Sequence, residues 1–187
     1  MFSRLVGANG RVYAFEADPE NYQLLTQNTK GLNNCKTFPI AVTDHSGTID
    51  FYESVEKSGC HSTVLGAVNL QRKISVPGCD LDTIISKEGE ESVAVIKMDI
   101  EGGEPLAIKG MIKLLRNSRE LILITELSAR RLYLAGVSPF EYLQTLSSFG
   151  FHFSLIKQEG LCPLNFPAEN INELFKLSDP ANVFCSR

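Results

Sequence analysis

The sequence predicts an α/β fold in which helical layers cover a mostly parallel sheet. Strand-like and helix-like segments alternate along the chain, which is the pattern of strand–helix units. No linker, internal repeat or low-complexity tract divides the chain. With 187 residues, of which 43% are hydrophobic, the chain is long enough to bury a sizeable core. We therefore expect a single domain over residues 1–187.

The first strand and the first helix are marked by composition and by a helix cap. The run RVYAFE at 11–16 is aromatic, β-branched and nearly continuous in apolar character, as expected of a buried strand. Asp18 then predicts the N-cap of a helix that has Pro19 at its first position. Gly31 predicts the end of this helix.

Shorter elements are expected in the next part of the chain. Residues 37–42 predict a second strand, and residues 48–52 alternate like a strand after a turn, which predicts a hairpin-like element. Residues 53–72 are polar and contain glycines, which predicts a loop. A short strand at 74–76 and a short helix at 81–86 follow.

Two buried strands and a broken helix are expected in the second half. The run VAVIKMD at 93–99 is the best candidate for a buried strand. Glu104 and Pro105 then begin a helix, which Gly110 is expected to break. Residues 121–125 predict another buried strand.

A capping box predicts where a helix begins in the C-terminal part of the chain. Ser138 to Glu141 has the form of this motif, with a proline at the first helical position, and predicts a helix that ends at Gly150. Residues 151–156 and 182–185 are the last strand candidates. We expect them to pair as an antiparallel edge, a common addition to a mostly parallel sheet.

Composition and charge exclude several classes of protein. The formal net charge of −4 argues against a nucleic-acid-binding protein, which relies on basic residues to neutralise phosphates. No apolar stretch approaches the ~20 residues of a membrane span, and the apolar start at 1–6 is too short for a signal peptide. The five cysteines form no C-x-x-C motif and predict reduced thiols in a cytoplasmic protein.

Acidic residues stand at the carboxyl ends of the predicted strands. Glu16, Asp99 and Glu126 each end a strand, and Asp44 lies just beyond a fourth. Ligands of open α/β sheets bind at this edge. Any one of these acids could be a helix cap or a solvated loop residue. Together, because clustered carboxylates repel, they predict a site for ribose hydroxyls, an amine, a sulfonium or a metal.

Glu16 and the cluster after residue 96 give the most specific predictions. A carboxylate at the position of Glu16 can accept two hydrogen bonds from ribose hydroxyls of a nicotinamide or adenosyl cofactor. The glycine-rich turn that usually precedes such a strand is not found in the residues before it. Lys97, Asp99 and Glu101 lie on one side of the strand if its alternation continues. This cluster is either a salt-bridged strand end or part of a reacting site.

The three histidines and the absence of several motifs limit which enzyme classes the sequence can belong to. His45 lies in a turn and His152 in a strand, so both are expected to be structural, whereas His61 is a candidate to face substrate. The sequence contains no G-x-S-x-G, P-loop or H-E-x-x-H motif. The sequence therefore lacks the motifs that serine hydrolases, P-loop proteins and zincins need for their chemistry.

Four segments together closely resemble the FkbM family of S-adenosylmethionine-dependent methyltransferases, and the resemblance covers residues 11–126 well. They are GRVYAFEADPENYQLLTQN (10–28), AVTD (41–44), CDLDTI (79–84) and IKMDIEGGE (96–104). The resemblance implies a Rossmann-like class I methyltransferase fold with a seven-stranded sheet and helices on both faces. It also implies methylation of a hydroxyl oxygen on a small molecule, glycan or lipid, with S-adenosylmethionine as cofactor.

The resemblance also implies roles for individual residues. Glu16 is similar to the acid that holds the cofactor ribose, and Asp44 to the acid near the adenine amine. Asp99 is similar to the acid beside the methionine moiety and the reacting hydroxyl, and is our candidate catalytic residue. The other matching acids, which we regard as candidates to contact substrate or a metal, are Glu101, Glu104 and Glu126. A divalent ion held by Asp99 and its neighbours is an alternative route of activation.

The sequence departs from the family pattern at its N-terminus. Family members carry a D-x-G-A-N-x-G turn after a first strand, followed by a helix, and residues 1–6 resemble only the end of that helix. We therefore expect the first strand and helix to be missing or truncated, with the neighbouring strands closing the gap or exposing their edges. Two alternative functions remain open: a non-catalytic interaction module with this fold, and a nicotinamide-dependent enzyme that uses Glu16.

Overall fold

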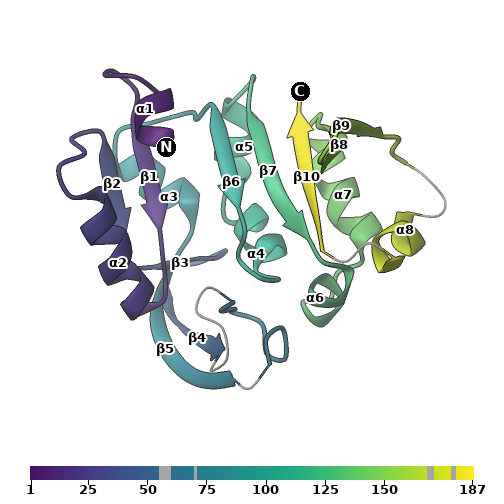
Figure 1. The fold of residues 1–187 in the computed structure, drawn as a ribbon, viewed down its shortest axis with the longest axis horizontal. Helices are drawn as coiled ribbons and strands as arrows, with labels where there is room; N and C mark the ends of the chain where they lie inside the picture. The colour runs from purple at the N-terminus through teal and green to yellow at the C-terminus, as the bar shows by residue number, and fades with distance from the viewer. Residues whose placement is uncertain (55–59, 70, 168–170, 178–179) are drawn as a thin grey trace.

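The strands of the computed structural model form three sheets, and the model describes residues 1–54, 60–69, 71–167, 171–177 and 180–187 (Figure 1). The first sheet pairs β1 (Val12–Phe15) with β2 (Cys35–Phe38). The second has the order β3 (Ala41–Val42), β5 (Gln71–Cys79), β4 (Gly47–Ser54). The third has the order β6 (Val95–Met98), β7 (Ile122–Leu127), β10 (Ala181–Ser186), β8 (His152–Lys157), β9 (Gly160–Leu164).

The helices α2 and α7 begin at the N-caps that the sequence predicts. Asp18 Oδ1 accepts a hydrogen bond from the backbone N–H of Asn21 at 2.7 Å, and the capping box between Ser138 and Glu141 is formed. Among the described helices, none is long and apolar enough to cross a membrane. The helices are α1 (Phe2–Leu5), α2 (Pro19–Thr29), α3 (Leu81–Lys87), α4 (Glu104–Lys109), α5 (Ile112–Asn117), α6 (Ala129–Leu134), α7 (Pro139–Ser148) and α8 (Ile171–Leu177).

Two predictions in the first half are corrected. The strand expected at 37–42 is two strands, because Pro39 cannot donate a backbone hydrogen bond and the chain leaves the first sheet there. β2 pairs with β1, whereas β3 pairs with β5. The expected hairpin-like element at 45–52 pairs differently: β4 runs antiparallel to the later strand β5, which extends the expected strand at 74–76 to nine residues.

The largest sheet is less parallel than predicted. β6 and β7 are parallel, but β10 inserts antiparallel between β7 and β8, and β9 continues the antiparallel pairing at the edge. The predicted antiparallel pairing of the last two strands is thereby confirmed. The sequence did not predict β9, α6 or α8. Each is only five to seven residues long, which is too short for hydrophobic periodicity to separate a helix from a strand or a loop.

The buried core lies mainly on one face of this sheet. Leu123, Thr125 and Leu127 of β7 are fully buried, whereas the alternate residues Ile122 and Ile124 are only partly covered. Helices α3, α4, α5 and α7 contribute most of the helical side chains in the same cluster as Leu123 and Leu127. These helices therefore pack on the face of the sheet that carries Leu123 and Leu127.

The sheets part between β1 and β6, which lie next to each other in Figure 1 but pair with other strands. Val95 of β6 is 46% exposed. The resemblance implies a single sheet, whereas β1 and β6 belong to separate sheets in this structure. β1, β6 and β7 nevertheless run in the same direction, so that their carboxyl ends lie along one side of the molecule (Figure 1).

Candidate functional site

A pocket lies at the carboxyl ends of β1, β3 and β6, where ligands of open α/β sheets bind. It brings together four of the residues singled out in the sequence: Glu16, His61, Asp99 and Glu101. Apolar side chains of residues 40–42, together with Phe15 and Phe51, form much of the remaining wall. The pocket therefore combines a hydrophobic surface with several carboxylates.

Glu16 is held by the start of the next helix. Its Oε1 accepts a hydrogen bond from the backbone N–H of Asp18 at 2.8 Å, which fixes the orientation of the carboxylate. Burial raises the pKa of Glu16, and that hydrogen bond opposes the shift. A carboxylate fixed in this way at the wall of a pocket can accept hydrogen bonds from the hydroxyls of a ligand.

His61 lies on the same side of the pocket as Glu16. Its Nδ1 accepts a hydrogen bond from the backbone N–H of Ser54 at 3.0 Å, which assigns the ring proton of the neutral imidazole to Nε2. That Nε2 lies 3.9 Å from Asp18 Oδ2, and the His61 side chain is 10% exposed. The predicted contact of His61 with substrate stays a prediction, and the structure places this residue beside Glu16.

Asp99 is the most accessible acid of the second cluster. Its side chain is 44% exposed, and its Oδ2 lies 3.0 Å from Lys97 Nζ. This is the lysine–acid pair expected from strand alternation across the end of β6. Asp99 therefore presents a carboxylate to solvent at the mouth of the pocket.

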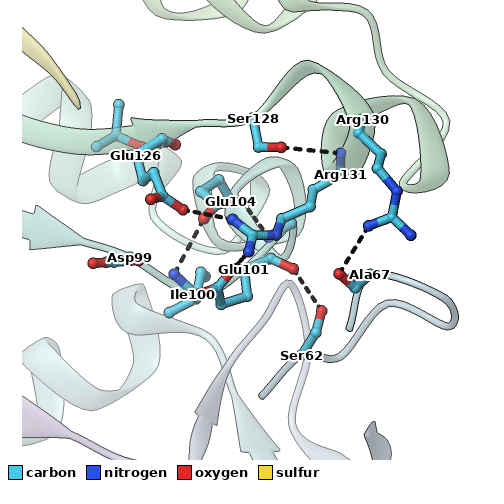
Figure 2. A network of polar contacts seen from close by, with 12 residues as sticks. Ser62, Ala67, Asp99, Ile100, Glu101, Glu104, Glu126, Ser128, Arg130 and Arg131 are labelled. Carbon is cyan, nitrogen blue, oxygen red and sulfur yellow. Dashed lines mark hydrogen bonds and ion pairs between the residues drawn. The ribbon is translucent and has the colours of Figure 1, made fainter. Parts of the chain in front are cut away.

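Glu104 braces the turn that follows β6 (Figure 2). Its Oε1 accepts from the backbone N–H of Ile100 at 3.1 Å, and its Oε2 accepts from that of Gly102 at 2.8 Å. The residue is 3% exposed, and burial raises its pKa to about 7. Both oxygens of Glu104 face the backbone, so the structure points to a bracing role. Its predicted contact with substrate or a metal is not tested by these contacts.

The turn braced by Glu104 contains an unusual backbone conformation at Glu101. The φ angle of Glu101 is 56°, a region that side chains other than glycine rarely adopt. The buried hydroxyl of Ser62 donates to the Glu101 carbonyl at 2.7 Å and so holds this conformation from the other side. Non-glycine residues held in such conformations cluster at functional sites.

Arg131 of α6 contacts two of the carboxylates (Figure 2). It forms ion pairs with Glu101 and with Glu126, the latter at 2.8 Å. Burial raises the pKa of both carboxyls, and Arg131 opposes the shift in each. Sequence reasoning missed Arg131, whose only signal was its position five residues after Glu126.

Three acids lie close enough together to share a cation. Carboxylate oxygens of Asp99, Glu101 and Glu126 all lie within 4.8 Å of one another. Carboxylates in such a group are suitable ligands for a divalent metal. Arg131 already contacts two of the three.

Asp44 is not among the residues that line the pocket. Its Oδ1 lies 2.6 Å from His45 Nδ1, and this hydrogen bond lowers the pKa of Asp44. The preceding residues 40–42 do line the pocket, so Asp44 follows directly after its wall. A role for Asp44 near an adenine amine stays a prediction.

Comparisons with known proteins give three matches. A family model described as the methyltransferase FkbM domain matches residues 1–153. The 2-O-methyltransferase NoeI of Sinorhizobium fredii is 28% identical over 153 aligned positions, which cover 74% of this chain and 62% of that protein. A crystal structure of methyltransferase FkbM from Methylobacillus flagellatus KT has a TM-score of 0.49 at 15% identity, covering 98% of this chain and 40% of that one. The chain thus spans less than two thirds of the length of these relatives.

Proposed function

The chain belongs to the FkbM methyltransferase family, and from this premise we propose that it transfers a methyl group from S-adenosylmethionine to a hydroxyl oxygen. The acceptor is a small molecule, a glycan or a lipid. The observation that carries the proposal is the pocket that joins Glu16, Asp99 and an apolar wall at the ends of three strands. A relative named as a 2-O-methyltransferase supports oxygen as the acceptor atom.

The donor side of the pocket suits an adenosyl group. Glu16 is our candidate to accept hydrogen bonds from the ribose hydroxyls. The fixed orientation of its carboxylate supports this assignment. Phe51 and residues 40–42 offer an apolar surface to an adenine ring. When bound, S-adenosylmethionine supplies an activated methyl group on a positively charged sulfur. The carboxylates around the pocket favour a cationic ligand of this kind.

The acceptor side depends on Asp99. Its carboxylate is accessible at the mouth of the pocket, which supports its assignment as the group that accepts or orients the proton of the acceptor hydroxyl. Lys97 holds one oxygen of Asp99 and leaves the carboxylate at the surface. The protein's main contribution is then to bring hydroxyl and donor together in a reactive orientation.

Isothermal titration with S-adenosylmethionine tests the donor assignment. We expect saturable binding that Glu16→Ala weakens by roughly tenfold, since two hydrogen bonds to a carboxylate are lost. Glu20→Ala removes an exposed acid of α2 outside the pocket and is the matched control. Both this chain and a version extended upstream should be measured. Absence of binding by the extended protein, or equal binding by Glu16→Ala, would overturn the assignment.

His61 offers a finer test of the same pocket. His61→Gln can still place a donor near Asp18, whereas His61→Asn can still accept from Ser54 but is too short to reach the carboxylate. If Nε2–H supports the donor site, His61→Asn should weaken S-adenosylmethionine binding several-fold more than His61→Gln. Equal affinities in the two variants would show that this proton has no part in donor binding.

A non-catalytic interaction module is the second candidate function. Within the part of the chain that the structure describes, β1 and β6 each have an unpaired edge, and this favours it because open strand edges can pair with another polypeptide. The titration distinguishes the two candidates. A module that has lost its activity should bind neither S-adenosylmethionine nor S-adenosylhomocysteine, even when extended upstream.

A further inference from the structure

We propose that Arg131 is the resident counter-cation of the carboxylate cluster, defined as Asp99, Glu101 and Glu126. In this role it orients the side chains of Glu101 and Glu126 without a divalent ion. Its importance for catalysis rests on the proposed methyl transfer. Its role as the cation of the cluster does not, and the two can be tested separately.

The guanidinium lies between two strand ends that are distant in sequence (Figure 2). One nitrogen contacts Glu126 Oε2 at 2.8 Å at the end of β7, and the other contacts Glu101 Oε2 after β6. The side chains are 20% exposed for Arg131, 11% for Glu101 and 17% for Glu126. Ion pairs this sheltered from water are screened less than surface pairs.

The backbone of Arg131 is also fixed against the turn that carries Glu101. A Cβ at Gly102 would lie 3.1 Å from Arg131 Cβ, which is tighter than most side-chain contacts, so glycine favours this close approach of the turn to α6. Gly102 has a φ angle of 101°, which also favours glycine. Ser128 caps α6 and accepts from the backbone N–H of Arg131. Both ends of the contact are therefore held in place.

The charge balance explains why a cation is needed here. Three carboxylates within 4.8 Å of one another repel, and such a group either takes up protons or binds a cation. Arg131 pairs with two of them and Lys97 pairs with Asp99, which leaves a single net negative charge. That remaining negative charge favours a cationic ligand such as a sulfonium over a neutral or an anionic one.

Manganese binding tests the proposal independently of methyl transfer. The free Mn²⁺ signal in electron paramagnetic resonance is followed during titration of the wild-type chain and of Arg131→Met. We expect Arg131→Met to gain roughly tenfold or more in Mn²⁺ affinity, because a positive charge in contact with the ligands is removed. Arg131→Lys, which keeps the charge, should behave like the wild type.

Arg130→Met is the matched control variant. Arg130 is the neighbouring residue on α6, but its guanidinium donates to the backbone carbonyls of Gly66 and Ala67. Its loss should therefore leave Mn²⁺ affinity unchanged. Adding Glu126→Gln to Arg131→Met should abolish the gain, because one of the three ligands is lost.

Two results would overturn the proposal. One is tight Mn²⁺ binding by the wild-type chain that Arg131→Met does not strengthen, which would make the cluster a metal site despite the arginine. The other is a folded Arg131→Met that, like the wild type, binds no Mn²⁺. If Arg131→Met does not fold, the Mn²⁺ titration is repeated with Arg131→Gln, which removes the same charge and keeps hydrogen-bonding capacity. The same criteria then apply. Failure of S-adenosylmethionine to bind would leave these results intact.

Discussion

At the residue scale, Glu104 links the shape of the site to pH. Burial raises its pKa from 4.5 to about 7, so the folded chain holds the proton more tightly than the unfolded chain. The resulting stability is fully present below about pH 4.5 and is lost as the pH rises through about 7. The shift corresponds to about 3 kcal/mol of unfolding free energy.

Glu104→Gln should remove most of this pH dependence. We expect urea unfolding of the wild type to show falling stability between about pH 5 and pH 8, and a flatter profile in the variant. The protonated carboxyl of Glu104 and the amide of glutamine each present one carbonyl oxygen to the two backbone N–H groups, so we expect similar stability of the two proteins at low pH. Glu120→Gln, an exposed acid before β7, is the control. Parallel profiles for wild type and Glu104→Gln would contradict this role.

Site residues differed in how far the sequence revealed them. Glu16, Asp99 and Glu126 were predicted because each ends a strand, and strand ends are local signals. Ser62 and Arg131 were missed because their roles depend on contacts made only in the folded chain. Ser62 meets Glu101, which is 39 positions away, and no spacing rule connects the two.

At the element scale, the segment 60–69 is fastened to the site at two points. Ser62 is fully buried, donates to the Glu101 carbonyl and accepts from the backbone N–H of Val64 at 2.9 Å. Arg130 holds the carbonyls of Gly66 and Ala67. These contacts explain why a polar, glycine-containing stretch that predicts only a loop lies ordered over the site.

Ser62→Ala should loosen this segment. The change leaves the buried carbonyl of Glu101 and the part-buried N–H of Val64 without this partner, at a cost of roughly 1–3 kcal/mol. Hydrogen exchange should therefore become faster at the backbone amides of 60–69 and at Gly102 and Gly103, whose turn it supports. Ser148→Ala, an exposed serine on α7, controls for loss of a hydroxyl. Unchanged exchange in the segment would show that the Ser62 hydroxyl does not hold it in place.

Prediction of the elements succeeded where the signal was local. The caps at Asp18 and Ser138 placed α2 and α7 correctly. The division of 37–42 depended on which sheet each half joins, and the insertion of β10 between β7 and β8 depended on strand pairing far apart in sequence. Hydrophobic periodicity carries no information about such pairings.

At the scale of the whole molecule, the pocket spans all three sheets. Its wall takes Phe15 from β1 and residues 41–42 from β3, with Phe51 from β4 and Asp99 after β6. β1 and β6 themselves belong to different sheets and are not paired with each other. A ligand that contacts every wall of the pocket therefore connects sheets that backbone hydrogen bonds leave separate.

Ligand binding should for this reason protect both open edges at once. With S-adenosylhomocysteine at a hundred times its dissociation constant, we expect about 2.7 kcal/mol of added stability. Slower hydrogen exchange should appear at the amides of both Val12–Phe15 and Val95–Met98. Glu16→Ala at the same ligand concentration is the control, since weaker binding should reduce both effects in proportion. Protection confined to one of these strands would mean that the ligand contacts one sheet alone. Ligand binding would then not connect the sheets of β1 and β6.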